Sequence, residues 1–309
     1  MNQPRISIIL VSYQVRQLLL SCLESIRQTI GLGADVEVLV IDNASTDGSV
    51  DAVKAAFPEV ILIANSFNAG FSGANNQGIV QAKGDYIFLL NPDTELLPGA
   101  VEKLLAYLEA HSACVLVAPQ LLNSDGSLQL SAWKETRVLA LLLETVYLHV
   151  FFPVSPYPIE QLRSVFEPSS LSGAALFFRK SLITQIGMLD TALFWMEDVD
   201  FCRRARTTGH LAYLPSAQVI HHSGQSQKRN YHIAISNQLL SKLKYFRKYH
   251  SRPVCWVGNV ACFIFVCSRI IAFGVASPMG EIYRLKRKAY LYTFRKLMRY
   301  LFLNDQTVV

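Results

Sequence analysis

Short apolar runs alternate with helical segments through the first ninety residues of the chain. Unbroken apolar runs predict four strands, at residues 6–11, 36–41, 60–64 and 85–90. Apolar positions at helical spacing predict helices between them, at residues 18–30, 50–57 and 72–83. Because each run is apolar on both faces, the pattern predicts an α/β fold with a mostly parallel sheet covered by helices.

The alternation continues less regularly after residue 96. We expect a helix at residues 98–111, with Pro98 in its first turn, a strand at 114–118 and a hairpin turn at 123–127. Residues 138–152 are strongly apolar but too short to cross a bilayer, so they form either a core helix or a helix at a membrane interface. A strand is expected at 170–179, where Gly173 either lets a ligand approach the backbone or forms a bulge.

Polar side chains follow the fourth predicted strand. The sequence Asn91-Pro92-Asp93 ends it, because proline cannot donate to a sheet ladder. Asp93 is therefore expected at the carboxyl edge of the sheet, where open α/β folds bind ligands. A carboxylate there can hold a divalent cation that in turn holds a diphosphate. The alternative is an ordinary turn, since Asp after Pro is a common turn pair.

Asp42 and Asn43 end the second predicted strand at the same edge. The residues that follow, 45–47, are good helix N-caps, and capping explains them without explaining Asp42. A carboxylate at that position can accept the imide N–H of a pyrimidine base. No GxGxxG motif follows the first strand, which argues against a dinucleotide cofactor.

Residues 194–204 place three acids beside an aromatic side chain. An acidic first turn of a helix, favoured by the helix dipole, accounts for Glu197 and Asp200. Asp198 is a candidate general base, because partial desolvation raises the pKa of a carboxylate toward the working range. Further along, His221 and His222 end a short strand expected from residue 219. Either they are simply the polar end of a strand, or one of the two imidazoles completes the metal site to which Asp93 contributes.

The last eighty residues are apolar and basic. We expect helices at residues 230–250 and 281–302, the second basic and amphipathic, and an apolar segment at 254–276 that is long enough to span a bilayer. Arg269 lies inside that segment, which favours a monotopic or re-entrant helix over a true span. Residues 242–300 hold thirteen Lys or Arg and one acid, Glu281. Because long apolar runs separate these charges, an anionic membrane is favoured over nucleic acid as the partner.

Composition narrows the domain organisation and the compartment. A chain of 309 residues that is 51% hydrophobic can form one large domain with an appendage, which we place at residues 1–229 and 230–309. Six cysteines without CxxC pairs predict neither a zinc site nor a disulfide framework and favour a reducing compartment. The first residues run straight into a strand without a signal peptide, so we expect the catalytic body at the cytoplasmic face of the membrane.

Seven motifs occur together and in order between residues 6 and 226. They read SIILVSY, VIDNASTDGS, NAGFSGANNQG, FLLNPDTEL, SGAALFFR, FWMEDVDFCRR and HHSGQS. In this order and approximate spacing the chain resembles the family 2 inverting glycosyltransferases, which have the GT-A fold. Within that family it is most similar to the bacterial rhamnosyltransferases that build cell-surface polysaccharides.

The resemblance implies a role for each matching residue. Asp42 contacts the nucleotide base, and the same resemblance places the rest of the nucleotide site at Ser12, Tyr13, Asn43, Asn68, Gly70 and Asn75 or Asn76. Asp93 matches the last acid of the metal-binding DxD motif, whose first position is Asn91 here, leaving one carboxylate in place of two. His221 matches the histidine that helps hold the metal or the diphosphate, with His222 as the alternative.

The catalytic base implied by the resemblance is Asp198, in the ED motif, and Gly173, Trp195 and Glu197 line the donor and acceptor pocket. The expected cofactor is Mg²⁺ or Mn²⁺, and the expected acceptor is a lipid-linked saccharide. A dTDP-rhamnose donor and a UDP-sugar donor both remain open, because thymine and uracil present the same imide edge to Asp42. The competing classes are a catalytically silent nucleotide-sugar scaffold at the membrane and a nucleic-acid-binding protein.

Overall fold

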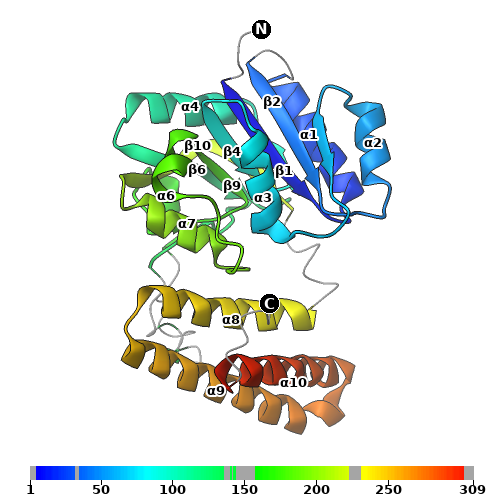
Figure 1. The fold of residues 1–309 in the computed structure, drawn as a ribbon, viewed down its shortest axis with the longest axis vertical. Helices are drawn as coiled ribbons and strands as arrows, with labels where there is room; N and C mark the ends of the chain where they lie inside the picture. Colours follow the sequence, from blue (N-terminus) through cyan, green and yellow to red (C-terminus); the bar gives the residue numbers. More distant parts are fainter. Residues whose placement is uncertain are drawn as a thin grey trace. The chain divides into compact units, whose positions relative to one another are not determined.

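The computed structural model describes residues 5–31, 35–135, 140, 142–143, 157–222 and 231–302 (Figure 1). The chain forms two compact units. The first takes its described residues from Met1–Lys134, Pro156–Thr191 and Glu197–Ser223, and the second from Glu135–Ser155, Ala192–Met196 and Gly224–Val309. Most of the apolar segment 138–152 lies outside the described residues.

The first unit is built on an eight-stranded sheet in the order β3-β2-β1-β4-β9-β6-β10-β5. Its strands are β1 Ile6–Ser12, β2 Val36–Asp42, β3 Ile61–Ala64, β4 Tyr86–Leu90, β5 Thr94–Leu96, β6 Cys114–Leu122, β9 Ala175–Arg179 and β10 His210–His221. Four neighbouring pairs are parallel and three, β4–β9, β9–β6 and β10–β5, are antiparallel. A separate pair joins β7 Ala132–Trp133 to β8 Ser170–Leu171.

Helices cover both faces of this sheet, as the all-apolar strands predict. The helices are α1 Arg16–Thr29, α2 Ser49–Ala56, α3 Gly70–Gln81, α4 Ala100–Ala110, α6 Ser181–Ile186 and α7 Glu197–Ala205. Along β1, Ile8 and Leu10 enter the core shared with α1, α2 and α4, whereas Ile9 enters the core shared with α3, α6 and α7. Alternate side chains of one strand therefore reach opposite layers, and the strand stays apolar throughout.

The helix expected at 98–111 is confirmed to within two residues; it begins at Ala100, after Gly99 turns the chain with a φ of +76°. Other predictions for this unit are wrong. The single strand expected at 170–179 is divided into β8 and β9 by residues 172–174. The strand expected from residue 219 begins at His210, and β5 was not predicted. The hairpin turn at 123–127 is confirmed, with Gly126 donating to the Asn123 carbonyl.

The second unit, which we call the helical unit, consists mainly of α8 Tyr231–Tyr249, α9 Arg252–Val275 and α10 Glu281–Phe302 (Figure 1). All three helices were predicted to within two residues. Ring contacts pair Phe263 with Phe294, Phe265 with Tyr290, and Phe273 with Tyr283. Because the α10 partner moves backward as α9 advances, the two helices are antiparallel. In the described part of the chain, α9 is the one helix long and apolar enough to cross a membrane by length and composition.

Candidate active site at the carboxyl edge of the sheet

Parallel pairing brings the ends of three strands to one edge of the sheet. β1 lies between β2 and β4, with Ser12 in register with Asp42 and Leu10 in register with Leu90. The residues after β2 and β4 therefore emerge on the same side, as open α/β sheets require for a ligand crevice. This edge carries nearly all of the candidate residues named from the sequence.

Asp42 is buried at the end of β2, with 1% of its surface exposed. Its Oδ2 accepts a hydrogen bond from the backbone N–H of Ser45 at 2.8 Å. Among the described residues, nothing donates to Oδ1, and the hydroxyl of the neighbouring Ser12 also lacks a partner there. Buried polar atoms are rarely left unmatched. Two adjacent ones at a ligand edge indicate a place for a bound polar group.

Hydrogen bonds connect the loop that follows β1 to the loop that follows β2, next to Ser12 and Asp42. Gln14 donates its backbone N–H to the Ser45 hydroxyl at 3.0 Å, and its side-chain amide donates to Thr46. Gln14 and Ala44 both have positive φ angles, 58° and 63°, which residues with a Cβ adopt only at a cost. Tyr13 stands beside them with nearly half of its surface exposed.

Asn43 connects β2 to the loop before α3. Its Oδ1 accepts from the side chain of Asn65 and from the backbone of Ala69, and its Nδ2 donates to the Gly70 carbonyl. Three of its four hydrogen-bonding capacities are thus used inside the protein. The Asn43 side chain therefore holds the loop before α3 in place, and one N–H of its amide is left for a ligand.

The remaining residues of the expected nucleotide site lie at or near the start of α3. Asn68 accepts the backbone N–H of Gly70 at 2.8 Å, and Gly70 has a φ of +73°, which glycine adopts freely. The N-terminus of α3 has no acidic residue in its first turn and suits an anion. Asn75 and Asn76 are directed into the protein: Asn75 donates to the Phe71 carbonyl, and Asn76 exchanges two hydrogen bonds with the Leu189 backbone.

β5 places Asp93 beside His221. This three-residue strand pairs antiparallel with the end of β10, with Thr94 opposite His221, and the His222 backbone donates to the Asp93 carbonyl at 2.8 Å. As a result, Nε2 of His221 lies 3.4 Å from Oδ1 of Asp93, and both side chains are mostly buried. The two residues are 128 positions apart in the sequence and meet because of a strand that the sequence pattern did not predict.

The two histidines have different surroundings. His222 follows the last residue of β10; its ring nitrogens contact the Ser124 hydroxyl and the Glu95 carboxylate. His221 instead has its Nδ1 at 2.7 Å from Oε1 of Gln129. Gln129 is itself held, because its amide nitrogen donates to the Asn123 side chain and to the His221 carbonyl. The side chain that lies beside the Asp93 carboxylate is therefore that of His221, whereas His222 contacts Asp93 through its backbone alone among the described contacts.

The chemistry of this pair fits a divalent cation that is shared with a ligand. Within the described ranges, no three His, Cys, Asp or Glu side chains gather closely enough to hold a metal by themselves. Mg²⁺ is commonly held by one or two carboxylates together with substrate phosphates, so a carboxylate and an imidazole suffice when a diphosphate supplies the other ligands. The first position of the motif, Asn91, has its backbone N–H bonded to Ala174.

Asp198 lies in the first turn of α7 and is fixed by two backbone groups. Its Oδ2 accepts from the Gly173 N–H at 3.0 Å and its Oδ1 from the Val199 N–H at 2.8 Å. A Cβ added to Gly173 would stand 3.2 Å from the Cβ of Asp198, so a side chain at position 173 would crowd the carboxylate. The group that approaches Gly173 closely in the structure is the Asp198 side chain, and the approach of a ligand there stays a prediction.

The loop between β8 and β9 links this carboxylate to the Asn91–Asp93 turn. Gly173 contacts Asp198, and the next residue, Ala174, accepts the backbone N–H of Asn91. Burial raises the pKa of Asp198 above its ordinary value of 3.8, and the backbone N–H groups of Gly173 and Val199 oppose that rise. A carboxylate with a raised pKa, next to the ligand edge, is the kind of group that accepts a proton during catalysis.

The other acids of this stretch differ from Asp198 in their contacts. Asp200 is fully buried and forms an ion pair with Arg204 at 2.8 Å, and Arg204 also donates to the backbone carbonyls of Ile186, the last residue of α6, and Met188. Asp200 is therefore structural. Glu197 begins α7 and is half-buried. Trp195, two residues earlier, has a φ of +80°, and its indole N–H lacks a partner among the described residues.

Comparison with known proteins identifies the family of the chain. Residues 7–186 match the model of glycosyl transferase family 2. The chain is 32% identical, over 213 residues, to the N-acetylglucosaminyl-diphospho-decaprenol L-rhamnosyltransferase of Mycobacterium tuberculosis, which covers 63% of this chain and 69% of that protein.

Two solved structures share the fold. A mannosyltransferase from Pyrobaculum calidifontis in complex with GDP-Man and Mn²⁺ superposes with a TM-score of 0.58 at 15% identity, covering 99% of this chain and 89% of that one. GalNAc-T7 with UDP, GalNAc and Mn²⁺ superposes with a TM-score of 0.59 at 14% identity, covering 99% and 58%. The mixed, mostly parallel sheet is that of the GT-A fold, and the chain is a glycosyltransferase that belongs to family 2.

Proposed function

We propose that this glycosyltransferase transfers L-rhamnose from dTDP-rhamnose to a lipid-linked saccharide, with inversion at the anomeric carbon. The observation that carries the proposal is the link through residues 173–174 between the Asp198 carboxylate and the turn that holds Asp93. The mycobacterial relative, whose name gives rhamnose as its donor sugar and a diphospho-decaprenol as its acceptor, supports this choice of substrates. The cytoplasmic face of the plasma membrane is the proposed location, with residues 1–229 as the catalytic domain and 230–309 as its membrane-associating extension.

The nucleotide would enter along the carboxyl edge of the sheet. Asp42 has an unmatched acceptor oxygen suited to the imide N–H of thymine, and Ser12 adds a hydroxyl beside it. Both are covered by protein, so the base reaches them only if the covering side chains shift. The N-terminus of α3, which begins at Gly70, would face the phosphates.

Asp198 would act as the base of a single displacement. Its ionised carboxylate removes the proton from the acceptor hydroxyl as that oxygen attacks the anomeric carbon. The bond between that carbon and the diphosphate breaks on the opposite side, dTDP leaves with the electron pair, and the configuration inverts. The backbone N–H groups of Gly173 and Val199 each hold one oxygen of the carboxylate, and the acceptor hydroxyl would use a remaining lone pair of one of these oxygens.

Asp93 and His221 would hold a divalent cation together with the diphosphate oxygens. When bound, the cation offsets the negative charge that develops on the leaving diphosphate. Asn91 leaves the site with one carboxylate where the DxD motif has two, so the diphosphate itself must complete the coordination.

The direct test is transfer from a panel of nucleotide sugars to an N-acetylglucosaminyl-diphospho-polyprenol, with Mg²⁺ or Mn²⁺ and with EDTA. We expect metal-dependent release of dTDP from dTDP-rhamnose and a product one deoxyhexose heavier. Release of UDP from a UDP-sugar instead would retain the chemistry and replace the donor. Nucleotide binding without transfer to any acceptor would favour the catalytically silent scaffold.

A further inference from the structure

One face of α9 carries exposed apolar side chains from its first turns to its last. Trp256, Val260, Ile264, Ile271 and Val275 follow one another at spacings of four, four, seven and four positions. At 3.6 residues per turn they form a single stripe down the helix. We call these five residues the α9 stripe. Contiguous exposed apolar surface of this kind marks a contact with another apolar phase.

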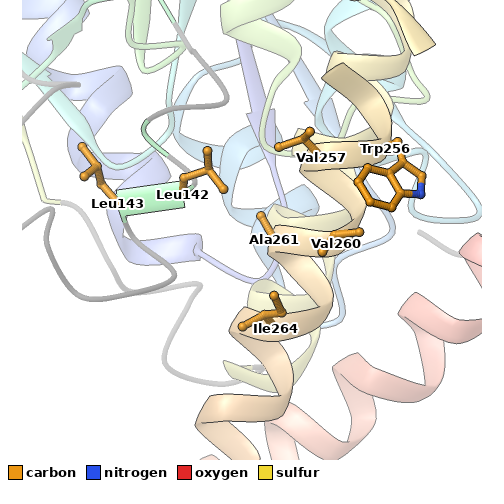
Figure 2. Close-up of a pocket in the computed structure, with 7 residues that line it drawn as sticks. All are labelled: Leu142, Leu143, Trp256, Val257, Val260, Ala261 and Ile264. Carbon is orange, nitrogen blue, oxygen red and sulfur yellow. The ribbon is translucent and has the colours of Figure 1, made fainter. Parts of the chain in front are cut away.

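A shallow groove widens the stripe at the N-terminal end of α9. It encloses about 350 Å³ and is lined by Leu142 and Leu143 on one side and by α9 residues between Trp256 and Ile264 on the other (Figure 2). Figure 2 shows Val257 and Leu142 directed toward each other across it. Every lining residue is apolar. The groove therefore extends the same apolar surface sideways from the helix.

The opposite side of α9 is packed against protein. Arg269 lies half a turn away from the centre of the stripe and is 4% exposed. Its guanidinium stacks on the Phe265 ring at 3.9 Å and donates to the Ser268 hydroxyl. Phe265 in turn contacts Tyr290 of α10. The Arg269 side chain, which interrupts the hydrophobic segment in the sequence, therefore points into the helical unit and away from the α9 stripe.

The antiparallel partner of α9 is strongly cationic. α10 carries seven Lys or Arg and one acid, Glu281. Two of these cations reach the last turns of α9: the Lys286 ammonium lies 5.5 Å from the Phe273 ring centroid, and the Arg287 guanidinium lies beside Gly274. If α9 crossed a bilayer, α10 would run back through the hydrocarbon beside it with its charges. Charged side chains at the centre of a bilayer are strongly unfavourable, which excludes that orientation for the packed pair.

We propose that α9 lies in the plane of an anionic lipid bilayer, with the α9 stripe and its groove inserted among the acyl chains and the cations of α10 at the headgroups. An apolar stripe beside a cationic helix has the charge and hydrophobic pattern of an interfacial helix. This inference rests on the proposed function for its biological purpose, since a lipid-linked acceptor would be presented at that surface. The binding itself requires neither the donor nor the acceptor.

The first experiment measures binding of the full chain to vesicles of phosphatidylcholine with 30% phosphatidylglycerol, without nucleotide sugar. Ile271→Asp should lower the binding constant at least about tenfold, because an apolar side chain leaves the lipid and a charge replaces it. Val80→Asp is the matched control, since Val80 on α3 is 66% exposed and Ile271 is 67% exposed. Equal losses in the two variants, or no loss in either, would overturn the proposal.

Charge and orientation are tested separately. Replacing the exposed Arg284, Arg287 and Lys288 together by Gln should weaken binding about 100-fold on the anionic vesicles and leave binding to pure phosphatidylcholine unchanged. For orientation, an environment-sensitive dye is attached to single cysteines at positions 256, 264 and 275, after the half-buried Cys255 and Cys267 are replaced by Ser. Quenchers at graded lipid depths should report one shallow depth for all three positions.

A deep dye at position 264 with shallow dyes at 256 and 275 would show a span and overturn the in-plane orientation. The outcome is separable from the proposed function. Vesicle binding with no sugar transfer contradicts only the proposed function, and transfer to a soluble acceptor analogue without vesicle binding contradicts only this inference.

Discussion

The first unit and the helical unit expose their functional surfaces in opposite ways. At the sheet edge of the first unit, Oδ1 of Asp42 and the hydroxyl of Ser12 are buried and have no hydrogen-bond partner within the described ranges. In the helical unit, apolar side chains such as Ile271 and Val275 are exposed without cover. Both departures cost free energy in an isolated chain, because buried polar groups lose water and exposed apolar groups order it. Each therefore indicates the chemistry of what binds there: a polar group in the first unit and an apolar phase in the helical unit, which we propose to be a nucleotide and lipid.

The largest effect should come from Asp198→Asn, which removes the proposed base while keeping the shape of the side chain. General base catalysis contributes 10²- to 10⁴-fold, so we expect kcat to fall about 1,000-fold. Steady-state release of dTDP measures it, and Asp51→Asn, at an exposed position in α2, is the control. A variant at position 198 that kept full turnover would remove the mechanism.

The raised pKa of Asp198 fixes the direction of the pH dependence. Activity requires the ionised form, so kcat/KM should rise with pH through an apparent pKa above 3.8. The folded state favours the protonated form, so ionising Asp198 costs stability as the pH rises from 3.8 through the raised pKa. Asn turns an N–H₂ toward one of the two backbone donors, so the test is the trend with pH: relative to the wild type, the melting temperature of Asp198→Asn should rise as the pH increases from about 4 to about 7. A difference that stays constant over that range would show that ionisation of Asp198 does not cost stability.

The second effect concerns the base of the donor. Asp42→Asn places an amide N–H₂ where the imide N–H of thymine would donate, so affinity for dTDP should fall about 30-fold, or about 2 kcal/mol. The same amide can pair with the N3 and N4 edge of cytosine, so the ratio of affinities for dCDP over dTDP should rise. Calorimetric titration of both nucleotides measures it. Parallel losses for the two would show that residue 42 supports the loop through Ser45 and does not read the base.

How much of this was predictable from sequence differs between the two units. The three long helices of the helical unit were predicted to within two residues, because they depend on local spacing of apolar residues. In the first unit, strands β1 to β4 were found from their unbroken apolar runs, whereas only the end of the parallel strand β10 was. β5, however, is three residues long and exists through its pairing with β10, and no local pattern marks it. The approach of Asp93 to His221 depends on that strand. The pair was therefore suggested by the resemblance to family 2 glycosyltransferases, and the local sequence pattern did not establish it.

Gln129 is the clearest residue missed at the site. It lies next to a turn that was predicted from Asp125 and Gly126, but its partner, His221, is 92 positions away. An amide that orients an imidazole has no spacing signature, because the contact depends on how two segments far apart in the sequence are placed. Likewise, the break between β8 and β9 lies where Gly173 contacts Asp198, a contact that no single segment contains.

The third effect lies in the helical unit and tests whether the protein-facing side of α9 is packed as described. Arg269→Ala removes the stacking on Phe265 and the hydrogen bond to Ser268, and should destabilise the helical unit by about 2 kcal/mol. Arg252→Ala, at the exposed first residue of the same helix, should cost less than about 0.5 kcal/mol. Hydrogen exchange of α9 amides reports the difference locally. Equal protection in both variants would mean that Arg269 does not anchor α9.

The smallest effect should come from Gln129, which we predict to be a positioning residue for His221. Its Oε1 lies 2.7 Å from Nδ1 of the imidazole, so an acceptor there favours the tautomer with its proton on Nδ1 and leaves the lone pair on Nε2, the nitrogen that faces Asp93. Gln129→Leu removes the acceptor. The metal concentration for half-maximal activity should rise about tenfold, with kcat at saturating metal nearly unchanged.

Two further variants separate positioning from simple packing. Gln129→Glu retains an acceptor at the same reach and should restore the metal dependence toward that of the wild type, whereas a packing defect would leave both variants alike. Gln28→Leu, on the exposed face of α1, controls for loss of a surface amide. If Gln129→Leu lowered the melting temperature and kcat but left the metal midpoint unchanged, Gln129 would hold the end of β10 through its bonds to Asn123 and the His221 carbonyl, and the tautomer of His221 would be set elsewhere.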